Sequence, residues 1–361
     1  MIDWFSKWNR DNPVDVYRSA ILYGVGGTVI IAAVAVVTLG QPWATDSLQT
    51  GPRGNGMMVT KRASQLAAPD PAIAAFLATS TDPVPPTLGG RTAGSQVEGA
   101  EPLLADLSPE NYERLVTAMR AWTGIPDLLS DPESYQTVVA RRMIQMTQNI
   151  NESWDGHVNA NKQVGVTCYT CHRGQPVPQG AWFIATPTVQ AAEGWSAVQN
   201  RVTPLSSYTS LPSDALQKYL VDGELIAVHD LESRAAGIPG QDGYPGIQKA
   251  ERTYALMNYF ANSLGVNCTL CHNTRAFYDG GQITPQWATA SLGILMVQEL
   301  NNDYLLPLAE VLPPERLGPH GDGPKVACNT CHRGEQQPLR GTDVIGNYPE
   351  LATTEAPDYG N

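Results

Sequence analysis

No cysteine precedes Cys168 in this chain of 361 residues, and all six cysteines lie in three short motifs. A lipid anchor would need a cysteine near about residue 20, so the sequence excludes that attachment. Basic residues are also few, because 23 lysines and arginines stand against 35 aspartates and glutamates, giving a formal charge of -12. This balance disfavours nucleic acid as a partner and favours a basic soluble protein. Strand signals are weak, which predicts a mainly helical fold.

Charge is missing altogether between Arg18 and Asp46. Because about 20 apolar residues suffice to cross a bilayer, we predict a transmembrane anchor over residues 19–41. The basic residues before it place residues 1–18 in the cytoplasm. That leading segment is long for a signal peptide and no clear small-x-small site follows, so we expect the anchor to be retained. The sequence thus predicts a single-pass protein of the inner membrane with most of the chain in the periplasm.

The three cysteine motifs all read Cys-x-x-Cys-His. This spacing lets both thiols form thioether bonds to one porphyrin edge while the histidine reaches the iron. A zinc knuckle would need four ligands gathered in pairs, and a redox dithiol has no use for the histidine. We therefore predict three covalently bound haem c groups, whose residues are Cys168, Cys171 and His172; Cys268, Cys271 and His272; and Cys328, Cys331 and His332.

Composition divides the exported part of the chain in two. Residues 42–104 are rich in proline, glycine and small side chains, and we predict an extended arm there. Helix-capping signals recur in residues 105–361, before helices expected after Ser108, Ser130 and Thr284, and these residues form the predicted periplasmic triheme domain. Within this domain, residues 164–168 resemble residues 264–268, and the sequence of residues 171–174 is repeated at residues 331–334. These internal repeats indicate duplicated units, each made of a helix, a turn and a Cys-x-x-Cys-His motif packed on haem, over about residues 105–200 and 245–345.

A second strong axial ligand would make each iron an electron carrier, and methionine raises the potential relative to histidine. For the haem at Cys268, Met257 lies upstream on a predicted helix that Gly265 could end just before the motif. For the haem at Cys168, Met143 and Met146 lie on one predicted helix. One of the two would ligate and the other would pack, and spacing alone does not choose between them.

The haem at Cys328 has three candidate ligands, which are His320 in a nearby loop, Met296 on the preceding helix, and the distant His157. If the helix of Met143 continued past Trp154, His157 would point to the same side of it, nearly four turns further on. Spacing leaves these three candidates open. His229 is expected to be an ordinary loop or surface histidine.

Several stretches resemble the cytochrome c subunit of purple-bacterial photosynthetic reaction centres, namely 138–143, 165–174, 301–308 and 343–351. The likeness covers roughly residues 105–351. It implies a mainly α multihaem cytochrome c with long irregular loops, and an electron carrier instead of an enzyme. By this resemblance the second ligands would be Met143 for the Cys168 haem, Met257 for the Cys268 haem and His157 for the Cys328 haem, giving two His/Met haems and one bis-His haem.

The sequence departs from that family at the position of a fourth haem. Most members carry an additional motif directly after the helix at 109–122, yet here residues 122–129 contain no cysteine or histidine. The methionine expected on the preceding helix is replaced by Val116. Because both sides of that site are missing together, the chain resembles a triheme variant of a usually tetraheme family.

The resemblance also implies a direction of electron transfer. A soluble donor such as cytochrome c2 or a high-potential iron-sulfur protein would reduce the Cys168 haem, and electrons would pass the Cys328 haem and leave from the Cys268 haem to the photo-oxidised bacteriochlorophyll pair. The implied partners are the reaction-centre L and M subunits, near the LH1 antenna. Two alternatives fit the motifs without the resemblance: a membrane-anchored carrier serving a respiratory oxidoreductase, and a haem enzyme with an open iron position.

Overall fold

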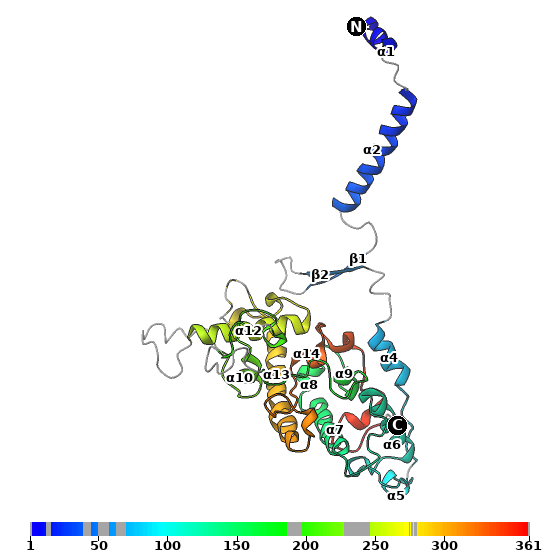
Figure 1. Cartoon of the computed structure of the whole chain (residues 1–361). Coiled ribbons are helices and arrows are strands. Elements are labelled where there is room, and N and C mark those ends of the chain that lie inside the picture. The colour runs from blue at the N-terminus through cyan, green and yellow to red at the C-terminus, as the bar shows by residue number, and fades with distance from the viewer. Residues whose placement is uncertain are drawn as a thin grey trace. The chain divides into compact units, whose positions relative to one another are not determined.

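The computed structural model describes residues 2–11, 16–38, 45–49, 58–62, 70–87, 89–185, 197–201, 203–226, 246–273, 275, 277 and 280–359. The chain divides into two units (Figure 1). One comprises residues 1–48 and 58–68, and the other comprises residues 49–57 and 69–361.

The first unit contains the apolar helix that the sequence predicts. The described elements of this unit are α1 (Ile2–Asp11), α2 (Val16–Thr38) and a two-stranded sheet of β1 (Thr45–Gln49) and β2 (Met58–Arg62). Within α2, the 18 residues Ser19–Val36 have a mean hydropathy of 2.1, and their apolar side chains are exposed. This helix is long and apolar enough to cross a membrane.

The second unit is mainly helical, as the sequence predicts, with short helices joined by long irregular loops. Its α-helices are α4 (Pro71–Thr79), α5 (Ala93–Gln96), α6 (Pro109–Thr123), α7 (Tyr135–Ser153), α8 (Asp155–Val158), α9 (Cys168–His172), α10 (Ala215–Leu220), α12 (Ile247–Leu264), α13 (Pro285–Glu299) and α14 (Cys328–His332). A π-helical segment, η6 (Leu300–Leu305), follows α13. The 3-10 turns are η1 (Pro102–Leu104), η3 (Pro204–Ser206), η4 (Cys268–Leu270), η5 (Gly280–Gln282), η7 (Leu306–Glu310), η8 (Pro314–Arg316), η9 (Pro338–Gly341) and η10 (Pro349–Leu351).

Capping residues set where the longer helices begin. Ser108 accepts a hydrogen bond from the Asn111 amide at 3.3 Å and Pro109 opens α6, as its sequence signal predicts. A similar signal at Ser130 predicts the start of the next helix, but α7 starts later, where the Ser134 hydroxyl accepts from the Thr137 amide. The hydroxyl of Ser130 accepts instead from Arg120 of α6.

The helix that carries Met143 does not continue to His157. Backbone angles at Trp154 (φ -112°, ψ 27°) end α7, and the same residue begins the separate short helix α8. His157 therefore lies on α8, and its direction is set by contacts beyond α7. The condition under which His157 would lie on the same helix as Met143 is therefore not met.

Of the segment expected to be an extended arm, the described residues between 70 and 104 are partly helical and pack into the core. Asp70 caps α4 by accepting from the Ala72 amide at 2.9 Å, and the alanine-rich stretch that follows favours a helix. Phe76 of α4 is only 2% exposed and stacks on Trp122 of α6, with 5.8 Å between ring centroids. Proline-rich flanks predict an extended chain here, but burial of Phe76 stabilises a helix against α6.

This same segment also contacts α7. The carboxylate of Glu101, 3% exposed, accepts two hydrogen bonds from the Arg141 guanidinium, at 2.7 and 3.0 Å. Such a bidentate pair fixes geometry as well as charge. Arg141 is two positions before Met143, so the pair holds the segment near residue 101 against the helix that carries a predicted haem ligand.

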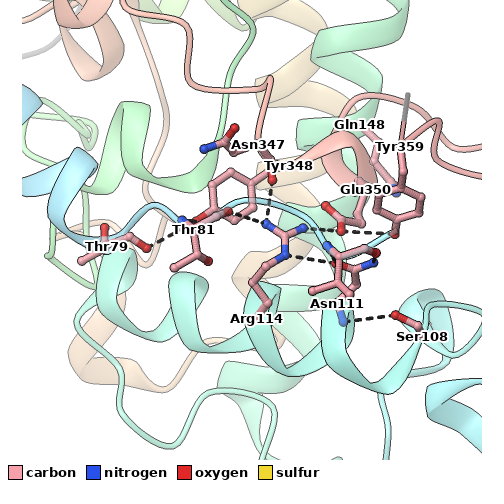
Figure 2. Close-up of polar contacts among 11 residues, drawn as sticks. Thr79, Thr81, Ser108, Asn111, Arg114, Gln148, Asn347, Tyr348, Glu350 and Tyr359 are labelled. Carbon is pink, nitrogen blue, oxygen red and sulfur yellow. Dashed lines mark hydrogen bonds and ion pairs between the residues drawn. The ribbon is translucent and has the colours of Figure 1, made fainter. Parts of the chain in front are cut away.

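Arg114 of α6 joins three segments that are far apart in the sequence (Figure 2). Its guanidinium donates to the carbonyl oxygens of Thr81 and Asn347, at 3.1 and 2.6 Å, and forms an ion pair with Glu350. The Glu350 side chain is fully buried and also accepts from the Tyr359 hydroxyl at 3.2 Å. The C-terminal residues, red in Figure 1, are thereby fixed beside α6.

Two hydrophobic clusters form the core of the second unit. The first joins α4 and α6 to part of α7 and to the C-terminal segment, and the second joins α10, α12 and α13. Between these two groups of helices lie the short helices α9 and α14, which contact each other (Figure 1). Two of the three Cys-x-x-Cys-His motifs therefore meet near the middle of the unit.

The two halves repeat one packing arrangement. α6 packs on α9 as α12 packs on α14, and the Gly174 and Gly334 amides donate to the equivalent carbonyls of Trp122 and Ser263 at 2.7 and 2.8 Å. Both long helices end in a left-handed glycine, Gly124 (φ 66°) and Gly265 (φ 64°). A Cβ on either glycine would collide with the carbonyl of Gly174 or Gly334. The close approach of helix end and motif therefore requires glycine at both positions.

Candidate haem sites

A cavity of about 340 Å³ lies beside the first motif. Its walls are mostly apolar and include Cys168, Cys171 and His172 of α9, together with Met143 of α7. Met146 lines this cavity as well as a second one, so it lies between the two, whereas Met143 faces the first cavity alone. The structure thus brings Met143 into the same cavity as the motif that the resemblance pairs with it.

The imidazole of His172 is held in the form that can bind iron. Its Nδ1 donates to the Gln175 carbonyl at 2.8 Å, which leaves the lone pair on Nε2. Burial lowers the pKa of His172, and the positive charge of Arg333 lowers it further. The ring is therefore neutral near neutral pH, as ligation requires.

A second cavity, also of about 340 Å³, lies beside the third motif. It is lined by Cys328, Cys331 and His332 and also by His157 of α8, which is far from this motif in the sequence. The two imidazole centroids are 6.2 Å apart, with 66° between the ring planes. A metal bound by both Nε2 atoms, with bonds of about 2 Å as in other first-row metal sites, would place the ring centres about 6 Å apart. The observed spacing therefore fits one iron between the two rings.

Both histidines of this pair have the required tautomer. The Nδ1 of His157 donates to the Thr289 carbonyl at 2.9 Å, and that of His332 donates to the Glu335 carbonyl at 3.0 Å. Burial lowers the pKa of His332 to about 4, with a further contribution from His157, and burial also lowers the pKa of His157. Each ring is neutral and keeps its Nε2 lone pair free.

Two residues of α13 position His157, and sequence reasoning missed both. Thr289 supplies the carbonyl that orients the ring, and Gly293 leaves room for it. A Cβ at Gly293 would lie 2.5 Å from Cε1 of His157, so any larger residue would displace the imidazole. Glycine inside a helix is unfavourable, and this was the one signal in the sequence that could have pointed to a close contact.

The other candidates for the Cys328 motif are placed differently. Met296 of α13 lines the second cavity, whereas His320 is exposed in its loop and is not part of the lining. His229 lies outside the described residues.

The Cys268 motif forms the turn η4 instead of a full helical turn. Asn267 caps it by accepting from the Thr269 amide, and Cys271 lines the second cavity while Cys268 is exposed. The His272 ring lies 5.3 Å from Phe277, and burial lowers its pKa. Met257 lies upstream on α12, partly buried against the second hydrophobic cluster. Its pairing with His272 stays a prediction.

The structure joins Cys171 and Cys331 by a disulfide, with their Cα atoms 4.5 Å apart. A sulfur atom in a disulfide cannot also form a thioether bond, so the structure differs from the prediction that both cysteines carry haem. The reason is the packing of α9 on α14, which brings the second cysteine of each motif to the same point. Disulfide and thioether are alternative states of these two thiols.

The duplicated packing aligns the end of α6 with the end of α12 and the Cys268 motif that follows it. Counted from the equivalent glycines Gly265 and Gly124, the residues Cys268, Cys271 and His272 correspond to Asp127, Ser130 and Asp131, and Met257 corresponds to Val116. None of the four replacements can bind haem as its counterpart would. Val116 and the nearby Leu128 and Leu129 are instead buried in the first hydrophobic cluster. Aliphatic side chains therefore pack at the end of α6, at the position equivalent to the Cys268 motif.

Apolar cavities beside thiols and neutral, oriented imidazoles fit covalently bound haem, and they define a c-type multihaem cytochrome. The family model for the photosynthetic reaction centre cytochrome c subunit matches residues 40–352. The chain is 52% identical to the subunit of that name from Roseobacter denitrificans, over 99% of each chain. It is 38% identical to the one from Rubrivivax gelatinosus, over 91% of this chain and 89% of the relative, and 35% identical to the one from Thermochromatium tepidum, over 90% and 80%.

The chain belongs to the photosynthetic reaction centre cytochrome c subunit family. Its role is therefore electron transfer in the reaction centre, with covalently bound haem c, in association with the photosynthetic membrane and a soluble donor. Membership in a family of electron carriers agrees with the expectation that the protein is not an enzyme, and it favours the reaction centre over the respiratory alternative.

Proposed function

We propose that this subunit carries three haems and passes electrons from a soluble periplasmic donor to the photo-oxidised bacteriochlorophyll pair. Thioether attachment would use the paired cysteines of all three motifs, with Cys171 and Cys331 in their thiol state before attachment. The proximal ligands are His172, His272 and His332, and the second ligands are Met143, Met257 and His157. Haem, when bound, supplies a reversible one-electron couple whose potential depends on these ligands.

The observation that carries this proposal is the opposed pair His157 and His332. The two rings belong to segments far apart in the sequence, both are neutral, and both keep Nε2 free at a spacing that fits one iron. Structural histidines in a core have no reason to adopt this arrangement on two sides of an apolar cavity. The pair supports a bis-histidine site with no open coordination position, which suits an electron carrier and disfavours a haem enzyme.

The proposed order of transfer, from the Cys168 site through the Cys328 site to the Cys268 site, is supported by shared walls. Met146 and Ile150 line both cavities, and Cys271 of the remaining motif lines the second one. The Cys328 site is thus next to each of the others. The chain keeps the three sites close together and surrounds the two cavities with mostly apolar side chains that exclude water.

The surroundings of the subunit follow from its anchor and its charge. α2 would cross the inner membrane once, leaving the second unit on the periplasmic side. There it would bind the L and M subunits near the LH1 antenna. A formal charge of -12 favours a basic donor, such as a cytochrome c2, through electrostatic steering.

Haem content is expected to be three per chain. Pyridine haemochrome absorbance and intact mass should both give three, and replacing Cys268 and Cys271 with serine should remove one haem and leave two. Because Asp127 and Ser130 stand where thiols would be needed, no fourth haem is expected. A mass corresponding to four haems, or to fewer than three in the native chain, would contradict the assignment.

Flash excitation tests the function itself. In native membranes washed free of soluble donor and poised under reducing conditions, a flash is expected to oxidise haem within microseconds, as seen in the α-band. The recovery of the bacteriochlorophyll pair should follow the same time course. Absence of any haem signal under this poise would rule out a bound reaction-centre donor.

A further inference from the structure

Two arginines lie where the Cys168 and Cys328 motifs meet. Arg173 follows α9 and Arg333 follows α14, and both adopt a left-handed backbone conformation, with φ of 47° and 52°. This conformation is uncommon for a residue other than glycine, and it occurs at both equivalent positions. The repeated packing of the two halves therefore places one guanidinium on each side of the contact between the motifs.

Each guanidinium crosses to the opposite motif. Nη2 of Arg173 donates to the carbonyl oxygen of Cys331 at 3.4 Å, and Nη2 of Arg333 donates to the carbonyl oxygen of Cys171. Neither arginine bonds to its own motif in this way. Each positive charge consequently lies against the second cysteine of the facing haem site, and Arg333 is close enough for its charge to act on His172.

These charges are not neutralised by nearby acids. Among the ion pairs in the described part of the chain, none involves Arg173 or Arg333. Both side chains are partly buried, and the buried Nε atom of each has no hydrogen-bond partner there. Two like charges held together in a partly buried site are costly, so a purely structural role is a poor explanation for the pair.

We propose that Arg173 and Arg333 form a shared electrostatic element that raises the reduction potentials of the Cys168 and Cys328 haems together. The inference rests on the proposed function, since it takes both motifs to hold haem. Oxidation adds a positive charge to a haem iron, and an unpaired cation in a low-dielectric site opposes that change. Because each guanidinium crosses to the facing motif, either arginine acts on both sites. The Cys268 haem lies outside the contact and is not affected.

Redox titration of the full-length protein in detergent tests this inference. Replacement of Arg173 or Arg333 with glutamine is expected to lower two of the three potentials. The expected size is roughly a tenfold change in the oxidation equilibrium, which is 59 mV for a one-electron couple. Lysine at the same position keeps the charge without the planar fork, and it should retain most of the native potential. Glutamine at Arg340, an exposed arginine, is the matched control and should change none of the three.

The outcomes separate the inference from the proposed function. Haem content is measured first, because a chain without three haems would contradict the proposed function independently of the arginines. With three haems present, a shift of one potential, of none, or of all three equally would overturn the shared role. Equal loss of stability in the lysine and glutamine variants with unchanged potentials would show a structural role instead. If one glutamine variant fails to accumulate, the other carries the same test, because the two positions are equivalent.

Discussion

Replacing His157 with methionine is expected to raise the reduction potential of one haem and leave the other two unchanged. Methionine opposite a histidine stabilises ferrous haem relative to a second histidine. The shift should be on the order of 100 mV, within the roughly 0.8 V that axial ligands span. Redox titration in the α-band measures it, with three one-electron components fitted to the native protein and to the variant.

His320 provides the control for this substitution. It is exposed in a loop before the Cys328 motif, so methionine at that position should leave all three potentials unchanged. If methionine cannot reach the iron from α8, one haem should become high-spin, which would identify His157 as its ligand equally well. Three unchanged, low-spin haems in the His157→Met protein would refute the assignment.

Replacing Arg114 with alanine is expected to destabilise the second unit by about 3–5 kcal/mol, the usual cost of leaving one member of a buried ion pair alone. Glu350 is fully buried, so its carboxylate would remain charged in an apolar site or take up a proton. The variant also loses the bonds to Thr81 and Asn347. Guanidinium unfolding of the full chain in detergent should show a lower midpoint at an unchanged slope.

Two comparisons make this result specific. Alanine at Arg340, whose guanidinium is exposed, removes its ion pairs with the partly exposed carboxylates of Asp70 and Glu335 and should cost only about 0–1 kcal/mol. Joint replacement of Arg114 by methionine and Glu350 by leucine should recover much of the loss, because no buried charge is left unpaired. Hydrogen exchange at Tyr348 should quicken in the Arg114→Ala protein. An unfolding midpoint within experimental error of the native value would contradict the role given to the pair.

The sequence predicted well the structural features that depend on a few neighbouring residues. The start of α6 after Ser108 and the end of α12 at Gly265 follow from local capping chemistry. The apolar stretch of α2 follows from composition. By contrast, the start of α7 was predicted too early, because Ser130 bonds to Arg120 of a neighbouring helix, and such a contact does not depend on local sequence.

The axial ligand of the Cys328 motif illustrates the opposite case. Spacing left His157, Met296 and His320 open, and the resemblance to the family favoured His157. The structure brings His157 to His332 because Thr289 and Gly293 of α13 orient its ring and leave room for it, and neither residue is near either histidine in the sequence. A rule based on sequence spacing cannot account for the space that Gly293, on a different helix, leaves for the imidazole ring of His157.

The sequence alone showed the patterns that depend only on neighbouring residues: three Cys-x-x-Cys-His motifs, an apolar span and a mainly helical chain. Tertiary structure decided which of these residues face each other. The packing of α9 on α14 brings Cys171 to Cys331 and directs Arg173 and Arg333 each to the facing motif, and burial of Phe76 makes α4, within the expected arm, part of the core. The physical reason is that these contacts depend on helix packing between distant segments, whereas thiol spacing and hydropathy are properties of the chain itself.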